Sequence, residues 1–180
     1  VNAAKTMTGK NIIVRLPVGL AVVSVLDGTT KYYFTQEDQN PMNIQCLDFD
    51  ENGLLYLVSG DKVTILDIET DQTDSFNLPM ALRAKILDIN VIDSNTFWIC
   101  SGIDGMMLID QNQNILCRID RDQKKSMQLI TSTISNLHRD EEDILWASAD
   151  PLGVYSITNN TAEFNVVSNF YVDEKSIKAG

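Results

Sequence analysis

The sequence predicts an all-β fold, and three observations support this prediction. The apolar segments are short and rich in β-branched and aromatic residues, as in Lys31–Phe34 and Lys62–Leu66. Turn signals such as Asn52-Gly53 and Asp104-Gly105 separate these segments. No window of a dozen residues keeps a helical period. Strands that alternate with turns about every eight to twelve residues are typical of sandwiches, barrels and propellers.

The composition indicates a soluble globular chain with an acidic field. Of the 180 residues, 44% are hydrophobic and 22% are charged, which is close to the globular norm. The net charge of −11 disfavours nucleic acid and anionic membrane surfaces, because both need a basic footprint. A neutral ligand such as a sugar, or a cation, fits this field better. The simpler alternative is that the excess acid keeps the domain soluble.

Cysteine usage predicts neither a disulfide framework nor a zinc site. The three cysteines, Cys46, Cys100 and Cys117, form no CxxC motif and no Cys/His pair. The chain shows no signal peptide at Val1 and no apolar run near the ~20 residues of a membrane helix. Because the chain starts inside a pattern, we expect a piece of a longer protein.

An internal repeat refines the fold prediction. Large aromatic residues at Tyr56, Trp98 and Trp146 lie 42 and 48 residues apart and serve as anchors for aligning the copies. The positions twelve, nine and one before each anchor are apolar in all three copies. In order, they are Ile44, Ile86 and Ile134, then Leu47, Ile89 and Leu137, then Leu55, Phe97 and Leu145.

The period matches the ~40–50 residues of a β-propeller blade, a four-stranded antiparallel sheet. The middle copy contains four strand-like runs: Ile86–Val91, Thr96–Cys100, Met106–Asp110 and Asn114–Arg118. A blade cannot bury both faces alone, so it stacks on its neighbours and the same offsets stay apolar in every copy. We expect the anchor rings to fill the gaps between blades.

About three and a half blades are predicted. Residues 1–38 form a partial blade with strands two to four, because Gly19-Leu20 stands in the place of Gly105-Met106. Full blades follow at 39–84, 85–130 and 131–168, and residues 169–180 start a further blade or supply a closing strand. The chain is then either a fragment of a larger propeller or a four-bladed ring closed by Phe170–Asp173. Open blade faces would favour self-association or contact with further blades.

The segment Ile134–Trp146 resembles the two-component regulator propeller repeat. In outline that repeat reads Asn-x-Val-x-x-Ile-x-x-Asp-x-x-Gly-x-Leu-Trp-x-Gly-Thr, followed by a Gly-Leu step. The resemblance covers about residues 12 to 168. Asp143 and Asn95 stand where the family has its turn glycine, and Tyr56 replaces one tryptophan.

The resemblance implies a sensor module on the periplasmic or extracellular side of a membrane-anchored receptor. Such propellers are typical of hybrid two-component systems of Bacteroides-like bacteria. The family resemblance implies oligosaccharide recognition, signalling to a histidine kinase outside this chain, and a ring larger than four blades. The fragment is therefore the favoured reading of the blade count. The alternatives are a propeller scaffold for protein–protein interaction and, less favoured, a glycan-active lyase or hydrolase.

Candidate ligand-binding residues lie in loops on one face of the propeller. Asp61, Asp104 and Asp150 each follow a second strand, on the same side as the connections between blades. Those connections are polar at residues 36–40 and 121–124. From them, Gln39, Asn40 and Arg121 are further candidates, with an aromatic ring as a platform for a sugar. The alternative is that these are ordinary turn residues.

No catalytic, metal-binding or cofactor-binding residues are predicted. His138 is the sole histidine and is expected at the surface of a strand. Ser135 and Ser156 lack the glycine context of a nucleophile elbow. The segment 48–53 faintly resembles a calcium loop, but its downstream glutamate is missing and a hairpin explains the residues. We therefore expect that the chain is not an enzyme.

Overall fold

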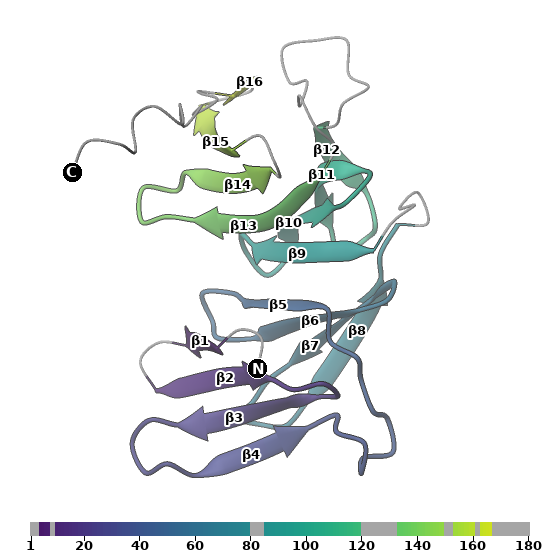
Figure 1. Ribbon diagram of the computed structural model, residues 1–180, viewed down its shortest axis with the longest axis vertical. Helices are drawn as coiled ribbons and strands as arrows, with labels where there is room; N and C mark the ends of the chain where they lie inside the picture. The colour runs from purple at the N-terminus through teal and green to yellow at the C-terminus, as the bar shows by residue number, and fades with distance from the viewer. Residues whose placement is uncertain are drawn as a thin grey trace, which may run out of the picture. The chain divides into compact units, whose positions relative to one another are not determined.

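A computed structural model of the chain describes residues 4–7, 10–79, 85–119, 133–149, 153–160 and 163–166. Within these ranges the chain forms strands and no helix, so no helix there is long and apolar enough to span a membrane. The strands make four antiparallel sheets of four strands each (Figure 1). The predicted all-β fold is confirmed.

Each sheet is a meander in which sequential strands are neighbours. The first holds β1 (Ala4–Met7), β2 (Asn11–Arg15), β3 (Leu20–Ser24) and β4 (Thr30–Tyr33). The second holds β5 (Cys46–Phe49), β6 (Leu55–Ser59), β7 (Lys62–Leu66) and β8 (Thr73–Asn77). The third holds β9 (Ile86–Val91), β10 (Thr96–Ser101), β11 (Gly105–Asp110) and β12 (Ile115–Ile119). The fourth holds β13 (Ile134–Arg139), β14 (Leu145–Ala149), β15 (Gly153–Asn160) and β16 (Glu163–Val166).

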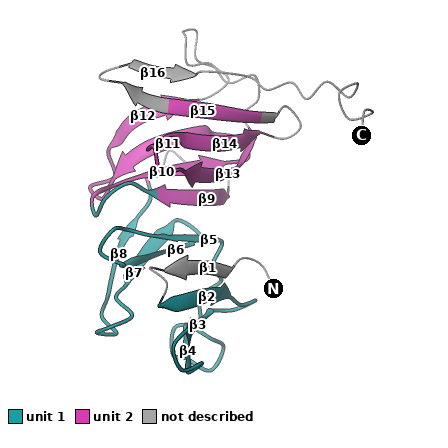
Figure 2. Ribbon diagram, turned by 90° about the vertical axis from the view of Figure 1, so that its left-hand side faces the viewer, with its two compact units in different colours: residues 1–78, 91–94 teal, residues 79–90, 95–180 magenta. Residues whose placement is uncertain are grey.

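The chain divides into two compact units, coloured separately in Figure 2. Unit 1 comprises Val1–Leu78 and Val91–Ser94, and contains the first two sheets. Unit 2 comprises Pro79–Asn90 and Asn95–Gly180, and contains the last two sheets apart from the end of β9. The two units are described separately below.

The first sheet corrects the prediction of a partial blade over residues 1–38. Strand β1 pairs with β2 from Ala4↔Val14 to Met7↔Asn11, so this blade has its innermost strand. Ala4–Met7 contains only one large apolar residue and no aromatic, so its pattern does not stand out in the sequence. Pairing with β2 defines the strand. The predicted further element at 169–180 lies outside the described residues.

The repeat positions form the core as predicted. All nine apolar residues at the three shared offsets are buried, with at most 8% of each exposed. In unit 1, the core between the two blades includes Ile13, Leu20, Ile44, Leu55 and Leu57. Full burial of each such side chain contributes about 1.5–3 kcal/mol relative to leaving it exposed. Stacked blade faces therefore supply the main stabilisation of the unit.

The anchor rings occupy matching places on the second strand of their blades. Tyr56 is 1% exposed and Trp98 is 4% exposed, while Trp146 is half-buried. The Tyr56 hydroxyl donates a 3.1 Å hydrogen bond to the carbonyl oxygen of Ser94, which also belongs to unit 1. The Trp146 indole Nε1 donates to Oδ2 of Asp140 at 2.7 Å.

The hairpins that precede Tyr56 and Trp146 are held by the same pattern of hydrogen bonds to an aspartate. Oδ1 of Asp50 accepts the N–H groups of Asn52 and Leu54, each at 2.9 Å. In the fourth sheet, Oδ1 of Asp140 likewise accepts the N–H groups of residues 142 and 144. Asp143 has φ +61, close to the +85 of Gly53, because aspartate tolerates the left-handed region better than most residues. The aspartate at a family glycine position thus keeps the same turn.

Carboxylates join the innermost strands of neighbouring blades. In unit 1, Oδ2 of the buried Asp48 accepts the N–H of Val91 at 2.9 Å. In unit 2, Oδ2 of Asp88 accepts the N–H of Leu137 at 2.8 Å. Innermost strands have one edge without a strand partner, so each carboxylate satisfies a backbone donor on that edge.

Candidate functional site

A pocket of about 530 Å³ lies on the first blade, beside the loop between β2 and β3. The β4–β5 connection forms its other wall, because the Leu20↔Tyr33 pairing brings the start of β3 next to the end of β4. Its lining residues are Leu16, Pro17, Val18, Tyr32, Thr35, Gln36 and Glu37. The pocket therefore lies between a loop that joins strands two and three of a blade and a connection between blades. This is the face on which the sequence predicted ligand contacts.

The lining combines an apolar wall, an aromatic ring and free polar groups. Leu16, Pro17 and Val18 form the apolar wall, and the ring of Tyr32 is 62% exposed. Gln36 and Glu37 are exposed, and their side chains make no hydrogen bond or ion pair within the described part of the chain. An exposed ring next to uncommitted hydrogen-bonding groups is the composition of a binding site for a polar ligand with an apolar face.

Backbone hydrogen bonds hold the two loops together before any ligand arrives. The Gly19 N–H donates to the Met42 carbonyl at 2.8 Å, and the Met42 N–H donates to the Phe34 carbonyl at 2.9 Å. Gly19 has φ +79, and a Cβ there would lie 2.3 Å from the carbonyl oxygen of Tyr33. Only glycine permits this approach. The pocket walls are therefore preorganised.

The β4–β5 connection begins with a strained residue. Phe34 has φ +56, an uncommon conformation for a bulky side chain. Immediately after it, the Thr35 N–H and hydroxyl both donate to Oδ2 of Asp38, at 2.6 and 3.1 Å. These contacts hold the turn that carries Gln36 and Glu37. Residues held in sparse backbone regions occur preferentially at ligand-binding and catalytic sites.

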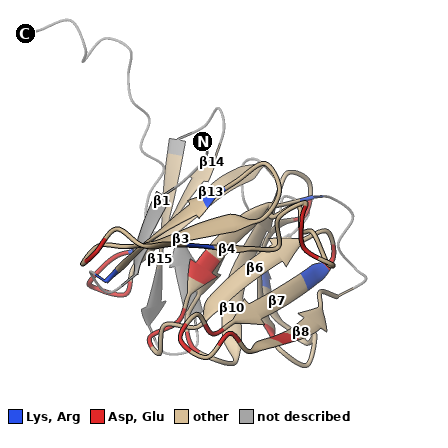
Figure 3. Cartoon of the chain, turned by 90° about the horizontal axis from the view of Figure 1, so that it is seen from below, with Lys and Arg blue, Asp and Glu red and all other residues tan. Residues whose placement is uncertain are grey.

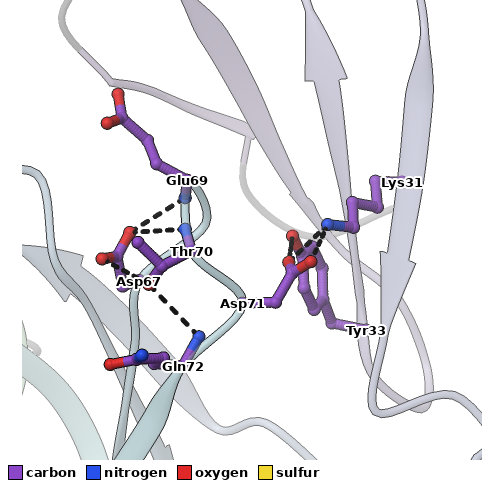
Figure 4. Close-up of polar contacts among 7 residues, drawn as sticks. All are labelled: Lys31, Tyr33, Asp67, Glu69, Thr70, Asp71 and Gln72. Atoms are coloured by element: carbon purple, nitrogen blue, oxygen red, sulfur yellow. Dashed lines mark hydrogen bonds and ion pairs between the residues drawn. The ribbon is translucent and has the colours of Figure 1, made fainter.

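A second pocket of about 410 Å³ lies at the opposite ends of the same strands. Lys31 and Tyr33, which line it, converge on Asp71 of the β7–β8 turn (Figure 4). The Lys31 ammonium forms an ion pair with Asp71, and the Tyr33 hydroxyl donates to Oδ1 of Asp71 at 2.8 Å. Lys31 is the first cause that lowers the pKa of Asp71, followed by Tyr33. These groups are committed to one another and link two blades, so the first pocket is the stronger candidate.

The predicted ligand-binding residues lie in different places in the structure, and none of those described lines the pocket. Gln39 and Asn40 are exposed in the β4–β5 connection but do not line the pocket. Asp61 is exposed in the β6–β7 loop, and its carbonyl accepts the N–H of Leu78 at 2.7 Å. Asp150 and Arg121 lie outside the described residues.

Asp104 is fully buried and does not present its side chain on the loop surface. Its Oδ2 accepts a 3.2 Å hydrogen bond from the Ser101 hydroxyl, and its Oδ1 lies 3.6 Å from Nη2 of Arg118. The recurring serine does not signal this orientation, because Asp61 follows Ser59 and is exposed. Asp104 therefore ties a loop to its own blade.

Tyr32 and the apolar wall are the site residues that sequence reasoning missed. Residues 36 and 37 were recognised only as part of a polar connection. The pairing of Ala21 with Tyr32 and of Leu20 with Tyr33 directs the two tyrosines to opposite faces of β4. The sequence shows Tyr32-Tyr33 as neighbours but does not indicate which one faces the loops.

The described residues offer little for covalent or metal chemistry. His138 is exposed, as predicted. Within the described ranges no three His, Cys, Asp or Glu side chains gather at metal-binding distance. Burial, followed by the nearby charge of Asp88, raises the pKa of the Cys100 thiol, and burial also raises the pKa of Cys117. Thiols of raised pKa are poor nucleophiles at neutral pH.

Stacked four-stranded meanders with buried repeat positions define this chain as a set of β-propeller blades. No protein-family model and no curated protein matches the sequence. Solved propeller structures do match. The extracellular domain of a B. thetaiotaomicron protein described as a hybrid two component system is 19% identical, with a TM-score of 0.56 over 88% of this chain and 20% of that chain.

Two further structures have the same fold. Streptogramin B lyase is 13% identical, with a TM-score of 0.65 over 91% of this chain and 52% of that one. PorZ, a surface component of the type-IX secretion system of Porphyromonas gingivalis, is 14% identical, with a TM-score of 0.64 over 92% of this chain and 26% of PorZ. The chain thus spans between a fifth and a half of these proteins. At such identities the similarity establishes the fold alone.

Proposed function

We propose that this chain is part of a periplasmic or extracellular propeller that senses oligosaccharides for a bacterial two-component receptor. One observation carries the proposal: a preorganised pocket lined by the exposed ring of Tyr32 and by Gln36 and Glu37, whose side chains make no bond to any described residue. The fold shared with an extracellular domain of a hybrid two component system is consistent with it.

The chemistry of the pocket suits a sugar. An aromatic face packs against the C–H groups of a pyranose ring, while amide and carboxylate groups bond its hydroxyls. A volume of about 530 Å³ lies within the ~300–1,000 Å³ range of small-ligand sites. Binding of a ligand to this face would then bias the parent receptor, with the histidine kinase outside this chain.

A binding role is favoured over an enzymatic one by the lining itself. Glycoside hydrolysis generally uses two carboxylates that flank the scissile bond. The described lining of the candidate pocket provides one, Glu37. We also propose that further blades complete the ring, because the similar extracellular domain is about five times as long as the part this chain covers.

A protein-interaction scaffold is the second candidate, and one observation favours it. Strand β12 is the outer edge of its sheet and exposes Ile115 by 38% and Leu116 by 52%. Apolar residues on an unpaired edge are a surface on which another chain can add a strand.

The test is a thermal-shift screen of the chain against neutral, amine-bearing and acidic oligosaccharides, followed by calorimetric titration of the best binder. We expect binding to raise Tm, because the ligand stabilises the native state. Tyr32→Ala should weaken binding at least tenfold, whereas Tyr32→Phe retains the ring and most of the affinity. Leu26→Ala is the matched control, because Leu26 is exposed in the β3–β4 turn and does not line the pocket. The proposal fails if no saccharide raises Tm, or if Tyr32→Ala binds like Leu26→Ala.

A further inference from the structure

We infer that Glu37 makes the pocket selective by charge, so that it takes neutral or amine-bearing oligosaccharides and rejects those that carry carboxylates or sulfates. This inference rests on the proposed function and specifies its class of ligand.

Among the described residues that line the pocket, Glu37 is the one that carries a charge. It is exposed, and no described residue pairs with it. A carboxylate accepts hydrogen bonds and donates none at neutral pH, so it favours hydroxyl and ammonium groups on the ligand. An anionic group in the same place would lose its water and meet a like charge.

The basic residues next to the lining residues in sequence are already engaged. Arg15, which precedes Leu16, donates to the carbonyl oxygens of Ile44 and Gln45. Lys31 precedes Tyr32 but pairs with Asp71, on the opposite face of β4. Neither cation is therefore positioned to neutralise an anionic ligand at the Tyr32 ring.

The wider field has the same sign. The chain carries 25 acidic and 14 basic residues, and Figure 3 shows acidic residues gathered in the loops at the strand ends. Fields of exposed charges extend over a Debye length of about 8 Å at physiological salt. A like-charge contact at about 4 Å weakens binding between roughly fivefold and a thousandfold, depending on how dry the contact is. We therefore expect discrimination of tenfold or more.

The experiment compares three β-1,4-linked saccharides of equal length: cello-oligosaccharides, chitosan oligosaccharides and oligoglucuronates. Calorimetric titration near pH 6 gives the affinity of the whole chain for each. We expect the neutral and amine-bearing probes to bind at least tenfold more tightly than the uronate. Raising the salt concentration should narrow that gap.

Glu37→Gln tests the residue itself. It should reduce the ratio of chitosan to glucuronate affinity by at least tenfold. Glu51→Gln removes one charge from the exposed β5–β6 turn and is the matched control for net charge. We expect it to leave the ratio within about twofold of the wild type.

Two results would overturn the inference while leaving saccharide sensing intact: equal affinity for the uronate and neutral probes, or equal effects of Glu37→Gln and Glu51→Gln. If none of the three probes binds and the wider screen also fails, both the proposed function and this inference fall. If only the wider screen finds binders, their charge tests the inference. Acidic saccharides among the tightest binders would overturn it, whereas neutral or amine-bearing saccharides alone would support it.

Discussion

The indole Nε1 of Trp146 donates a 2.7 Å hydrogen bond to Oδ2 of Asp140, the aspartate that caps the preceding hairpin. This bond ties an anchor of the repeat to its own turn. In the second sheet the anchor is Tyr56, which instead donates to Ser94. The corresponding Oδ2 of Asp50 is buried without a hydrogen-bond partner. With tyrosine in place of tryptophan at the anchor, the turn aspartate of the second sheet thus lacks the hydrogen bond that its equivalent in the fourth sheet accepts.

Trp146→Phe should raise the pKa of Asp140. The Trp146 hydrogen bond is the first cause that lowers this pKa, followed by the Ile144 N–H. A lowered folded-state pKa adds stability above the unfolded value of about 4, and that stability is lost as pH falls through the folded pKa. The difference in free energy of unfolding between wild type and variant should therefore be largest near neutral pH and should disappear in acid. Carboxyl-carbon NMR titration measures the shift, and an unchanged Asp140 titration would contradict this role for Trp146.

Asp48→Ala should loosen the contact between two innermost strands. The substitution leaves the Val91 N–H without its carboxylate acceptor, which costs about 1–3 kcal/mol. Amide hydrogen exchange at Val91 should accelerate, and Asp48→Asn should restore part of the protection because it keeps an acceptor oxygen. Asp74→Ala, at an exposed position on β8, serves as the control. Unchanged exchange at Val91 would show that the carboxylate does not protect this edge.

Gly19→Ala should destabilise the chain much more than Gly60→Ala. Both glycines have positive φ, +79 and +66, so both substitutions incur about 1–2 kcal/mol of backbone strain. At Gly19 a Cβ would also collide with backbone atoms of Tyr33 and Phe34, whereas at Gly60 nothing lies within 4 Å. We expect a total loss on the order of 3–4 kcal/mol for Gly19→Ala in urea unfolding. Equal losses for the two variants would contradict the close approach of the two loops.

Leu57→Ala should cost about 2–5 kcal/mol, because Leu57 is fully buried between the blades of unit 1. Leu26→Ala should change the free energy of unfolding by less than about 0.5 kcal/mol, because Leu26 is 88% exposed. Urea unfolding curves monitored by circular dichroism compare the two. Similar midpoints for the two variants would show that β6 does not form the core of the unit.

The repeat offsets predicted the core because stacking imposes the same burial on every blade. Ile86, Ile89 and Phe97 could be identified from spacing alone, and all three are buried. Strand β1 could not be found this way, since Ala4–Met7 has little apolar character and is defined by its pairing with β2. Asp104 illustrates a second limit: an acid in a turn looks the same in sequence whether it faces solvent or, as here, Ser101 and Arg118.

The sequence by itself determined the blades, because periodic burial and turn chemistry are local properties that each copy repeats. It also determined the face on which the loops gather, since alternating strand directions follow from the hairpins. Only the tertiary structure decided that Tyr32, Gln36 and Glu37 share one pocket with the β2–β3 loop. That convergence depends on the register between β3 and β4 and on the Gly19–Met42 hydrogen bond, which join residues distant in the chain and leave no periodic trace.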